Sequence, residues 1–261
     1  MEVLSHRIAW SFITLLLIIA VTGGWSKVLS ALADLKILAI LGATTLLIST
    51  NWLVFIIAVD HGQVLQSSFG YFVNPLVSVL LGAVFLGERL RRLQIVSLFL
   101  AVAGLLILAL SIGEVPWMSL VLAVTFALYG LLRKVVPTDA LTGLFVETLI
   151  LFPIASVYLV GIGATGKGVF PSSHMSDNLL LPLAGVITAV PLLWFSAAAR
   201  RLNLSTIGFM QYITPTNHFL LAVFAFGEPF TSSHLAGFAC IWAGLLAYTI
   251  DAVKRSTVRE S

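Results

Sequence analysis

Long apolar runs, separated by short polar or charged segments, follow one another along the whole chain. A helix rises about 1.5 Å per residue, so about 20 apolar residues cross a bilayer core of roughly 30 Å. The pattern therefore predicts an all-α, polytopic membrane protein with about nine transmembrane helices. The expected spans are 8–21, 37–59, 64–86, 93–111, 116–132, 140–162, 178–198, 204–226 and 235–250.

The first apolar run, 8–21, is short and follows His6-Arg7 almost at the start of the sequence. A cleaved signal peptide is the alternative to a span, but Gly23-Gly24-Trp25 is a poor cleavage site. We therefore interpret this run as a membrane span. The longest connection, 161–178, is rich in Gly, Ser and Pro and is expected to form an exposed loop.

One face of the span 64–86 is polar, because Tyr71, Asn74 and Ser78 recur in steps of three and four residues. Pro75 interrupts the same helix: it has no N–H group, so the carbonyl of Tyr71 loses its helical partner. In lipid such a carbonyl must be satisfied by protein, water or a ligand. A kinked helix with one polar side therefore predicts the wall of a cavity.

A second copy of this helix follows later in the sequence, in constant register and without a gap. The matched positions are Pro75 with Pro215, Gly87-Glu88 with Gly227-Glu228, Gly104 with Gly244, and Tyr71, Asn74 and Ser78 with Gln211, Thr214 and His218. The displacement that takes Pro75 to Pro215 is called here the repeat shift. The two copies are five spans apart, so they cross the membrane in opposite directions. This arrangement predicts two inverted repeats, 1–111 and 112–252, followed by a cytoplasmic tail, 253–261. Many secondary transporters are built from such repeats.

The first repeat contains four predicted helices, and the second contains five. When the repeat shift is applied backwards, the span 116–132 falls before Met1. Two explanations are open: the true start lies upstream, or the chain has lost its first helix. We expect an omitted start.

Composition supports a membrane protein, because 59% of the residues are hydrophobic and only 10% are charged. Soluble domains carry about 25% charged residues. The net charge of +3 does not indicate nucleic-acid binding, since the basic residues gather at helix ends. The single Cys240 forms no internal disulfide. Motifs for metal binding, ATP hydrolysis and intramembrane hydrolysis are missing, so we expect no metal, no cofactor and no enzyme.

Lys and Arg residues indicate the orientation, because cytoplasmic loops are enriched in them. Alternate loops and the C-terminus carry Lys27, Lys36, Arg89, Arg91, Arg92, Arg133, Lys134, Arg200, Arg201, Lys254, Arg255 and Arg259. The opposite side carries Arg7 and Lys167. This bias places the C-terminus in the cytoplasm. With nine spans, residue 1 is then expected outside.

Several runs resemble the RarD, or chloramphenicol-sensitive protein, branch of the EamA drug/metabolite transporter superfamily. They are Asn51-Trp52-Leu53, Gly70-Tyr71-Phe72-Val73-Asn74-Pro75-Leu76, Phe85-Leu86-Gly87-Glu88-Arg89, Tyr129-Gly130-Leu131-Leu132-Arg133-Lys134, Glu147-Thr148-Leu149, Pro191-Leu192-Leu193 and Gln211-Tyr212-Ile213-Thr214-Pro215-Thr216. The resemblance covers nearly the whole chain. It implies a ten-helix, two-repeat permease of the inner membrane with both termini cytoplasmic, and this chain departs from it where the first helix is absent.

We therefore predict a secondary transporter of the plasma (inner) membrane that exports small amphipathic metabolites or drugs by alternating access. The expected partners are a small-molecule solute, the lipid bilayer and, for coupling, protons, but no nucleic acid. Export and import are equally compatible with the spacing, as are a monomer and a homo-oligomer. The alternative is a membrane protein that does not transport, or a truncated remnant of such a permease.

Glu147, inside the span 140–162, is the first candidate site residue. An ionisable group within a membrane is a functional hypothesis by default, and burial disfavours its charged form, as proton coupling requires. Applied backwards, the repeat shift maps Glu147 onto Arg7. We predict that both face one central cavity, either paired with each other or binding a zwitterionic or anionic solute. The alternative is that Arg7 extends to the interface and Glu147 caps its helix in water.

The remaining candidates for solute contact are polar and aromatic side chains inside predicted spans. They are Asn51, Trp52, Tyr71, Asn74, Ser78, Trp194, Gln211, Tyr212, Thr214 and His218. The alternatives are hydrogen bonding between helices for the polar stripe, a satisfied core histidine for His218, and interface anchoring for the tryptophans. Tyr129 is interpreted as an interfacial residue. Glu88 and Glu228 are interpreted as ends of spans where a gate role is open.

Overall fold

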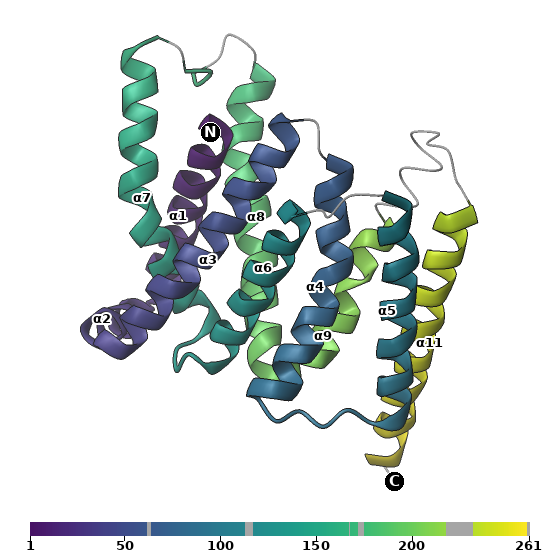
Figure 1. The fold of residues 1–261 in the computed structure, drawn as a ribbon. Helices are drawn as coiled ribbons and strands as arrows, with labels where there is room; N and C mark the ends of the chain where they lie inside the picture. Colours follow the sequence, from purple (N-terminus) through teal and green to yellow (C-terminus); the bar gives the residue numbers. More distant parts are fainter. Residues whose placement is uncertain (62–63, 113–116, 167, 172–174, 218–231, 260–261) are drawn as a thin grey trace. The chain divides into compact units, whose positions relative to one another are not determined.

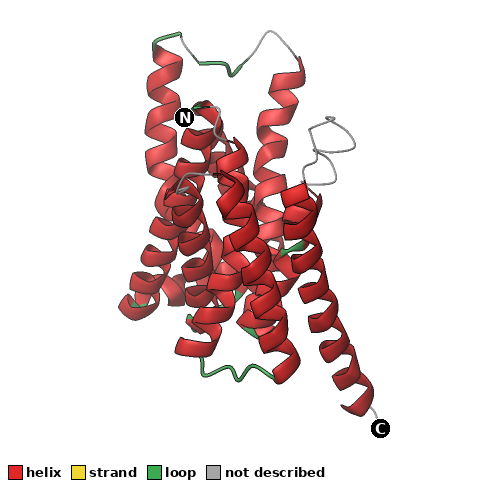
Figure 2. Ribbon diagram, turned by 45° about the vertical axis from the view of Figure 1, so that its right-hand side comes forward, coloured by secondary structure: helices red, strands yellow, loops and turns green. Residues whose placement is uncertain are grey.

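A computed structural model describes residues 1–61, 64–112, 117–166, 168–171, 175–217 and 232–259. These residues form helices joined by loops, without a strand (Figure 2). The helices are α1 Glu2–Thr22, α2 Trp25–Ala33, α3 Leu35–Asp60, α4 Val64–Phe85, α5 Arg92–Ile112, α6 Trp117–Val135, α7 Ala140–Ala164, α8 Met175–Arg201, α9 Leu204–Gln211 and α11 Ser232–Arg259 (Figure 1).

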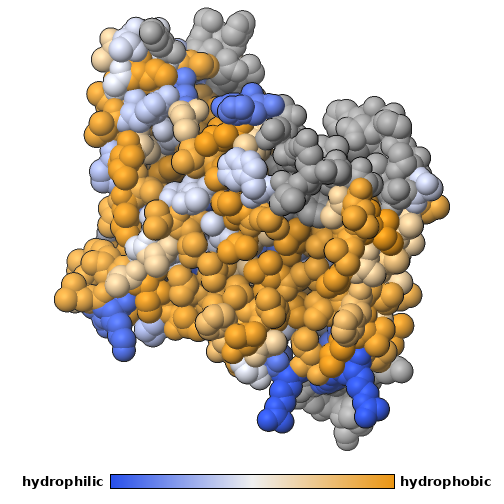
Figure 3. Space-filling view, viewed as in Figure 1, coloured by the Kyte–Doolittle hydropathy of each residue, from blue (hydrophilic) through white to orange (hydrophobic). Residues whose placement is uncertain are grey.

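The prediction of a polytopic helical membrane protein is confirmed. Within the described residues, six helices are long and apolar enough to cross a bilayer: α1, α3, α5, α6, α7 and α8. Shorter apolar helical stretches, Gly70–Phe85 and Leu235–Asp251, correspond to two more predicted spans. Apolar side chains cover most of the visible surface, and strongly hydrophilic ones gather near helix ends (Figure 3). The predicted span 204–226 begins as α9 and continues into residues outside the described part.

The connection between the first two spans is itself a helix, α2, which the apolar pattern did not predict. Gly23 ends α1 in the left-handed conformation, with φ of 71°, and the nine residues of α2 follow. Asp34 then starts α3, because its carboxylate accepts hydrogen bonds from the backbone N–H groups of Lys36 and Ile37. The predicted loop 161–178 is shorter than expected, since α7 extends to Ala164 and α8 begins at Met175.

The chain divides into two compact units, each built from one segment of the first half of the sequence and one segment of the second half. Unit 1 comprises residues 1–57 and 128–201, and unit 2 comprises residues 58–127 and 202–261. The predicted division at residue 111 separates two sequence repeats and not these compact units. It therefore stays a prediction.

In unit 2, α5 and α11 lie side by side along their lengths (Figure 1). A Cβ on Gly104 would lie 2.5 Å from the carbonyl oxygen of Gly237, and a Cβ on Gly244 would lie 2.8 Å from that of Ser97. The two helices are therefore antiparallel, and small residues let their backbones approach closely. The repeat shift converts one contact into the other, because it maps Ser97 onto Gly237 and Gly104 onto Gly244.

The second close pair of unit 2, α4 and α9, is also antiparallel. A Cβ on Gly82, near the end of α4, would lie 3.2 Å from the hydroxyl of Ser205, near the start of α9. About two turns further into α4 and one turn further into α9, a Cβ on Gly208 would lie 2.8 Å from the carbonyl oxygen of Pro75. Phe72 and Tyr212, which the repeat shift also relates, belong to the same buried apolar cluster.

In unit 1, α1 packs closely against both α7 and α8. The rings of Phe12 and Phe152, again related by the repeat shift, stack with centroids 4.3 Å apart. The hydroxyl of Ser11 donates to the carbonyl of Gly185 at 3.0 Å, and Gly185 leaves no room for a Cβ beside Trp10. Among the described residues, α3 and the end of α6 approach this core less closely, and long side chains bridge the space.

Glycine replacement provides a test of the close helix pair. We expect Gly104→Ala to lower the thermal unfolding midpoint in detergent, because its methyl group would overlap the α11 backbone. The matched control is Gly42→Ala in α3, where a Cβ meets no atom within 4 Å. Alanine favours a helix over glycine by about 1 kcal/mol, so the control should keep or raise the midpoint. Equal effects of the two substitutions would contradict the packing described here.

Candidate functional site

Glu147 is buried two turns into α7, at 1% exposure. The helix begins at Ala140, and its N-cap is Asp139, whose carboxylate accepts a 2.8 Å hydrogen bond from the backbone N–H of Thr142. Burial of Asp139 opposes its ionisation. Its hydrogen bonds with Thr142 and the nearby charge of Lys27 outweigh this effect, so the pKa of the Asp139 carboxyl is lowered. The alternative in which Glu147 caps α7 in water is therefore wrong.

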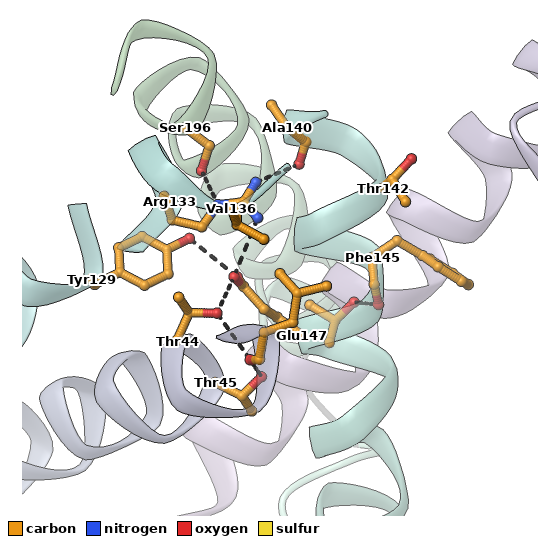
Figure 4. A network of polar contacts seen from close by, with 12 residues as sticks. Thr44, Thr45, Tyr129, Arg133, Val136, Ala140, Thr142, Phe145, Glu147 and Ser196 are labelled. Carbon is orange, nitrogen blue, oxygen red and sulfur yellow. Dashed lines mark hydrogen bonds and ion pairs between the residues drawn. The ribbon is translucent and has the colours of Figure 1, made fainter. Parts of the chain in front are cut away.

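Three side chains from two other helices contact the Glu147 carboxylate (Figure 4). The hydroxyl of Thr44, in α3, donates to Oε1 at 2.7 Å, and the hydroxyl of Tyr129, in α6, donates to Oε2 at 3.1 Å. Nη1 of Arg133, also in α6, lies 3.5 Å from Oε1. The carboxylate therefore has a cationic partner and two hydroxyl donors.

Arg133 is fully buried and extends the contacts to a fourth helix. Its Nε donates to the hydroxyl of Ser196, in α8, at 3.2 Å, and its Nη2 donates to the carbonyl of Ala140 at 2.9 Å. Gly143 makes room for the guanidinium, because a Cβ at this position would overlap Nη1. The cluster of Thr44, Tyr129, Arg133, Glu147 and Ser196, called here the polar cluster, joins α3, α6, α7 and α8.

Arg7 lies in α1 and belongs to a different set of contacts in unit 1. Its Nε donates to the hydroxyl of Thr188, in α8, at 3.1 Å. Its guanidinium lies over the ring of Trp52, in α3, 5.4 Å from the centroid, which is within cation–π range. The predicted pairing of Arg7 with Glu147 is therefore wrong, because Arg133 occupies the position beside the carboxylate. Binding of a solute by both residues stays a prediction.

Comparison with known proteins identifies the family. Residues 1–110 match the EamA-like transporter family. Protein RarD of Salmonella typhimurium is 45% identical over 252 residues, which cover 97% of this chain and 86% of that protein. Protein RarD of Escherichia coli is 43% identical, with coverage of 97% and 85%. The chain belongs to the RarD family of EamA transporters.

Other relatives carry related names. An uncharacterized transporter of Vibrio cholerae is 44% identical over 97% of this chain and 84% of that protein. The chloramphenicol-sensitive protein RarD of Pseudomonas aeruginosa is 33% identical over 97% of this chain and 86% of that protein. A solved crystal structure with 19% identity covers 96% of this chain and 88% of its own, with a TM-score of 0.63. That likeness shows the fold, and both the matched family and the Vibrio cholerae relative are described as transporters.

In this RarD-family chain, two residues of the polar cluster were misinterpreted from the sequence. The sequence pattern places Arg133 among the loop charges that set orientation and Tyr129 at the membrane interface, but both side chains are fully buried. They lie near the end of α6, where α7 and α8 cover them. A sequence signal existed: the two residues are four apart, hence on one helical face, and a buried Glu147 requires a cation.

The polar stripe of the RarD-family motif lies partly between packed helices. Asn74 and Ser78 are buried, and the Ser78 hydroxyl donates to Oδ1 of Asn74 at 3.1 Å. A Cβ on Gly208, in α9, would lie 3.2 Å from Cβ of Ser78. Ser78 therefore lies in the contact between α4 and α9, called here the α4–α9 seam, whereas its hydrogen bond to Asn74 is within α4. Hydrogen bonding between helices by this stripe stays a prediction. Tyr71 is half-buried.

The remaining candidates are distributed over several environments. Asn51 is half-buried beside Trp52, whereas Trp194 is 73% exposed and lies outside the polar cluster. Tyr212, next to Gln211, is buried where α9 ends, and neither its hydroxyl nor Oε1 of Gln211 has a hydrogen-bond partner among the described residues. Thr214 is exposed. His218 and Glu228 lie outside the described residues.

A double-mutant cycle tests the ion pair of the polar cluster. We expect Glu147→Leu to destabilise the protein by about 3–5 kcal/mol, because it leaves Arg133 buried without a counter-ion. Adding Arg133→Met should recover much of that loss, since the unpaired charge is then removed. Thermal or chemical unfolding in detergent measures both effects. Additive losses in the double variant would show that the two side chains are not coupled.

Proposed function

We propose that this RarD-family protein is a secondary transporter that exports small amphipathic metabolites or drugs by alternating access, in exchange for protons at Glu147. The observation that carries the proposal is the fully buried Glu147–Arg133 ion pair among four helices of an apolar bundle. Burying two charges costs several kcal/mol per ion. Ionisable groups inside membranes are rare and mark ion and substrate pathways.

Protonation of Glu147 would couple directly to helix position. The neutral carboxyl no longer balances the charge of Arg133, which binds Ser196 in α8. The same carboxylate also accepts the hydroxyls of Thr44 in α3 and Tyr129 in α6. Because close backbone packing does not hold α3 and the end of α6, their attachment depends on these polar contacts. A proton that weakens the contacts therefore shifts the balance between two helix arrangements.

Inverted repeats provide the framework for such alternation, and we include them in the proposal. The antiparallel contact of α5 with α11 supports it. The repeat shift maps Gly104 of α5 onto Gly244 of α11, and each of these glycines packs against the backbone of the other helix. Stacking of the equivalent Phe12 and Phe152 in unit 1 also supports it. The proposed arrangement has nine spans and a cytoplasmic C-terminus in the inner membrane. The Lys and Arg bias behind this orientation does not depend on Arg133.

Arg7 and Trp52 are the proposed solute contacts in unit 1. A guanidinium over an indole face offers both a positive charge and an apolar surface to a ligand. This combination suits an anionic or zwitterionic solute with an apolar part. Asn51, beside Trp52, would add amide hydrogen bonds. Tyr71, Asn74, Ser78, Gln211, Tyr212, Thr214 and His218 remain proposed contacts along the path, and Trp194 is the weakest candidate because of its exposure.

Transport by purified protein in proteoliposomes tests the proposal. The solutes would be a panel of small amphipathic compounds that includes chloramphenicol, after the name of the Pseudomonas aeruginosa relative. We expect Glu147→Gln to reduce pH-gradient-driven flux by about tenfold or more, since the amide cannot exchange a proton. Arg7→Gln should raise KM more than it lowers kcat.

Asp60→Asn, at the exposed end of α3, is the matched control and should leave flux unchanged. Wild-type flux in both Glu147→Gln and Arg7→Gln would exclude the proposed roles of these residues. Flux that persists in Glu147→Gln but no longer responds to the pH gradient would support proton coupling at this carboxylate.

A further inference from the structure

Helix α9 begins without a cap of its own. Its N-cap residue is Asn203, whose side chain makes no capping hydrogen bond. Backbone N–H groups in the first turn of a helix have no intrahelical partners and must be satisfied in another way. Glu88 supplies the acceptor: its carboxylate accepts from the N–H of Leu204 at 2.6 Å, the N–H of Ser205 at 3.0 Å and the hydroxyl of Ser205 at 2.7 Å.

The Gly87-Glu88 pair directs this carboxylate from the end of α4 to the start of α9. Gly87 adopts a left-handed conformation with φ of 63°, and the N–H of Glu88 donates to the carbonyl of Gly82 at 3.0 Å. A Cβ on Gly82 would lie 2.7 Å from Oε2 of Glu88. Glycine at position 82 therefore leaves the space that the carboxylate occupies, and glycine at position 87 permits the turn that brings it there.

Glu88 thus closes one end of the seam between α4 and α9. Further along the seam lies Ser78, at 2% exposure, which packs against Gly208 of α9 and donates to the buried Asn74. Hydrogen bonds to a carboxylate are stronger than neutral ones, and a negative charge at a helix N-terminus is favourable. These contacts hold the two helices together at the Glu88 end.

We propose that Glu88 is a positioning residue of the transport cycle, whose contacts with Leu204 and Ser205 form a latch that opens when the α4–α9 seam opens to water at this end. The proposal rests on the alternating access argued above. A permanent cap is the competing role. The two roles differ in one measurable respect: a latch controls water access to the seam, whereas a permanent cap does not.

Cysteine labelling measures that access without any solute. Ser78→Cys is made in a Cys240→Ser background, and a membrane-impermeant maleimide is applied to vesicles of both orientations. We expect Glu88→Ala to raise the labelling rate of Cys at position 78 about tenfold from the Glu88 side, because the carboxylate acceptor is lost. Glu88→Gln should have a smaller effect, since its amide oxygen still accepts a hydrogen bond.

The matched control is Ser97→Cys in α5, which is fully buried and whose carbonyl oxygen contacts Gly244 of α11, outside the α4–α9 seam. Glu88→Ala should leave its labelling rate unchanged. Unchanged labelling at position 78, or an equal rise at positions 78 and 97, would overturn the proposal, because the first indicates a permanent cap and the second indicates general loosening.

Cross-linking tests whether the latch opens during transport. Glu88→Cys with Ser205→Cys, in the Cys240→Ser background, is bridged by a short, reducible bifunctional thiol reagent. Flux should stop on bridging and return on reduction. The control pair is Arg91→Cys with Asp251→Cys, which replaces the 3.4 Å ion pair Arg91–Asp251, and bridging it should leave flux unchanged.

The two experiments separate the latch from the proposed function. Flux that continues while positions 88 and 205 are bridged would overturn the latch. If the unmodified protein transports none of the solutes, the transport proposal fails, whereas the labelling rates at positions 78 and 97 still decide whether Glu88 controls access to the seam.

Discussion

A carboxylate and a guanidinium buried together in an apolar bundle impose the strictest constraint on this structure. Each charge must find partners within the protein, because the surrounding lipid offers none. Glu147 and Arg133 meet most of this demand through their ion pair, hydroxyls of three helices and the first carbonyl of α7, and only Nη1 of Arg133 lacks a hydrogen-bond partner within this cluster. Even the backbone conforms, since Gly143 leaves room for the guanidinium. The pair and its partners join α3, α6, α7 and α8 at one place.

Two kinds of contact hold the helices of the bundle together. The pairs α5–α11 and α4–α9 use glycines, so their backbones approach closely and many weak contacts hold them. The helices α3 and α6 instead meet α7 and α8 through the side chains of the polar cluster (Figure 4). Contacts of the second kind are few and charged, so a change of one proton alters a large share of them.

The sequence predicted features that depend on the length of apolar runs and on the spacing of residues. It did not predict burial that depends on segments distant in the sequence. Within the described residues the apolar runs located six long helices and two shorter apolar ones, and the spacing around Pro75 and Pro215 predicted the repeat, some of whose equivalent segments contact each other within each unit. Glu147 was found because a carboxylate within a span is conspicuous. Arg133 was missed because a basic residue near a helix end is usually exposed. Its burial depends on α7 and α8, which local sequence does not reveal.

The chemistry of the ion pair gives the two partners unequal roles. Arginine stays protonated at any physiological pH, so Arg133 is a permanent positive charge, and Glu147 is the partner that can change. When Glu147 is neutral, the charge of Arg133 can be compensated in three ways. An anionic group of a solute can bind beside it, helix movement can admit water, or Glu147 can release its proton again. The first two are the binding step and the conformational step of a transporter. In the proposed transport cycle, a buried ion pair with one titratable member therefore suffices to link the proton, the solute and the position of the helices.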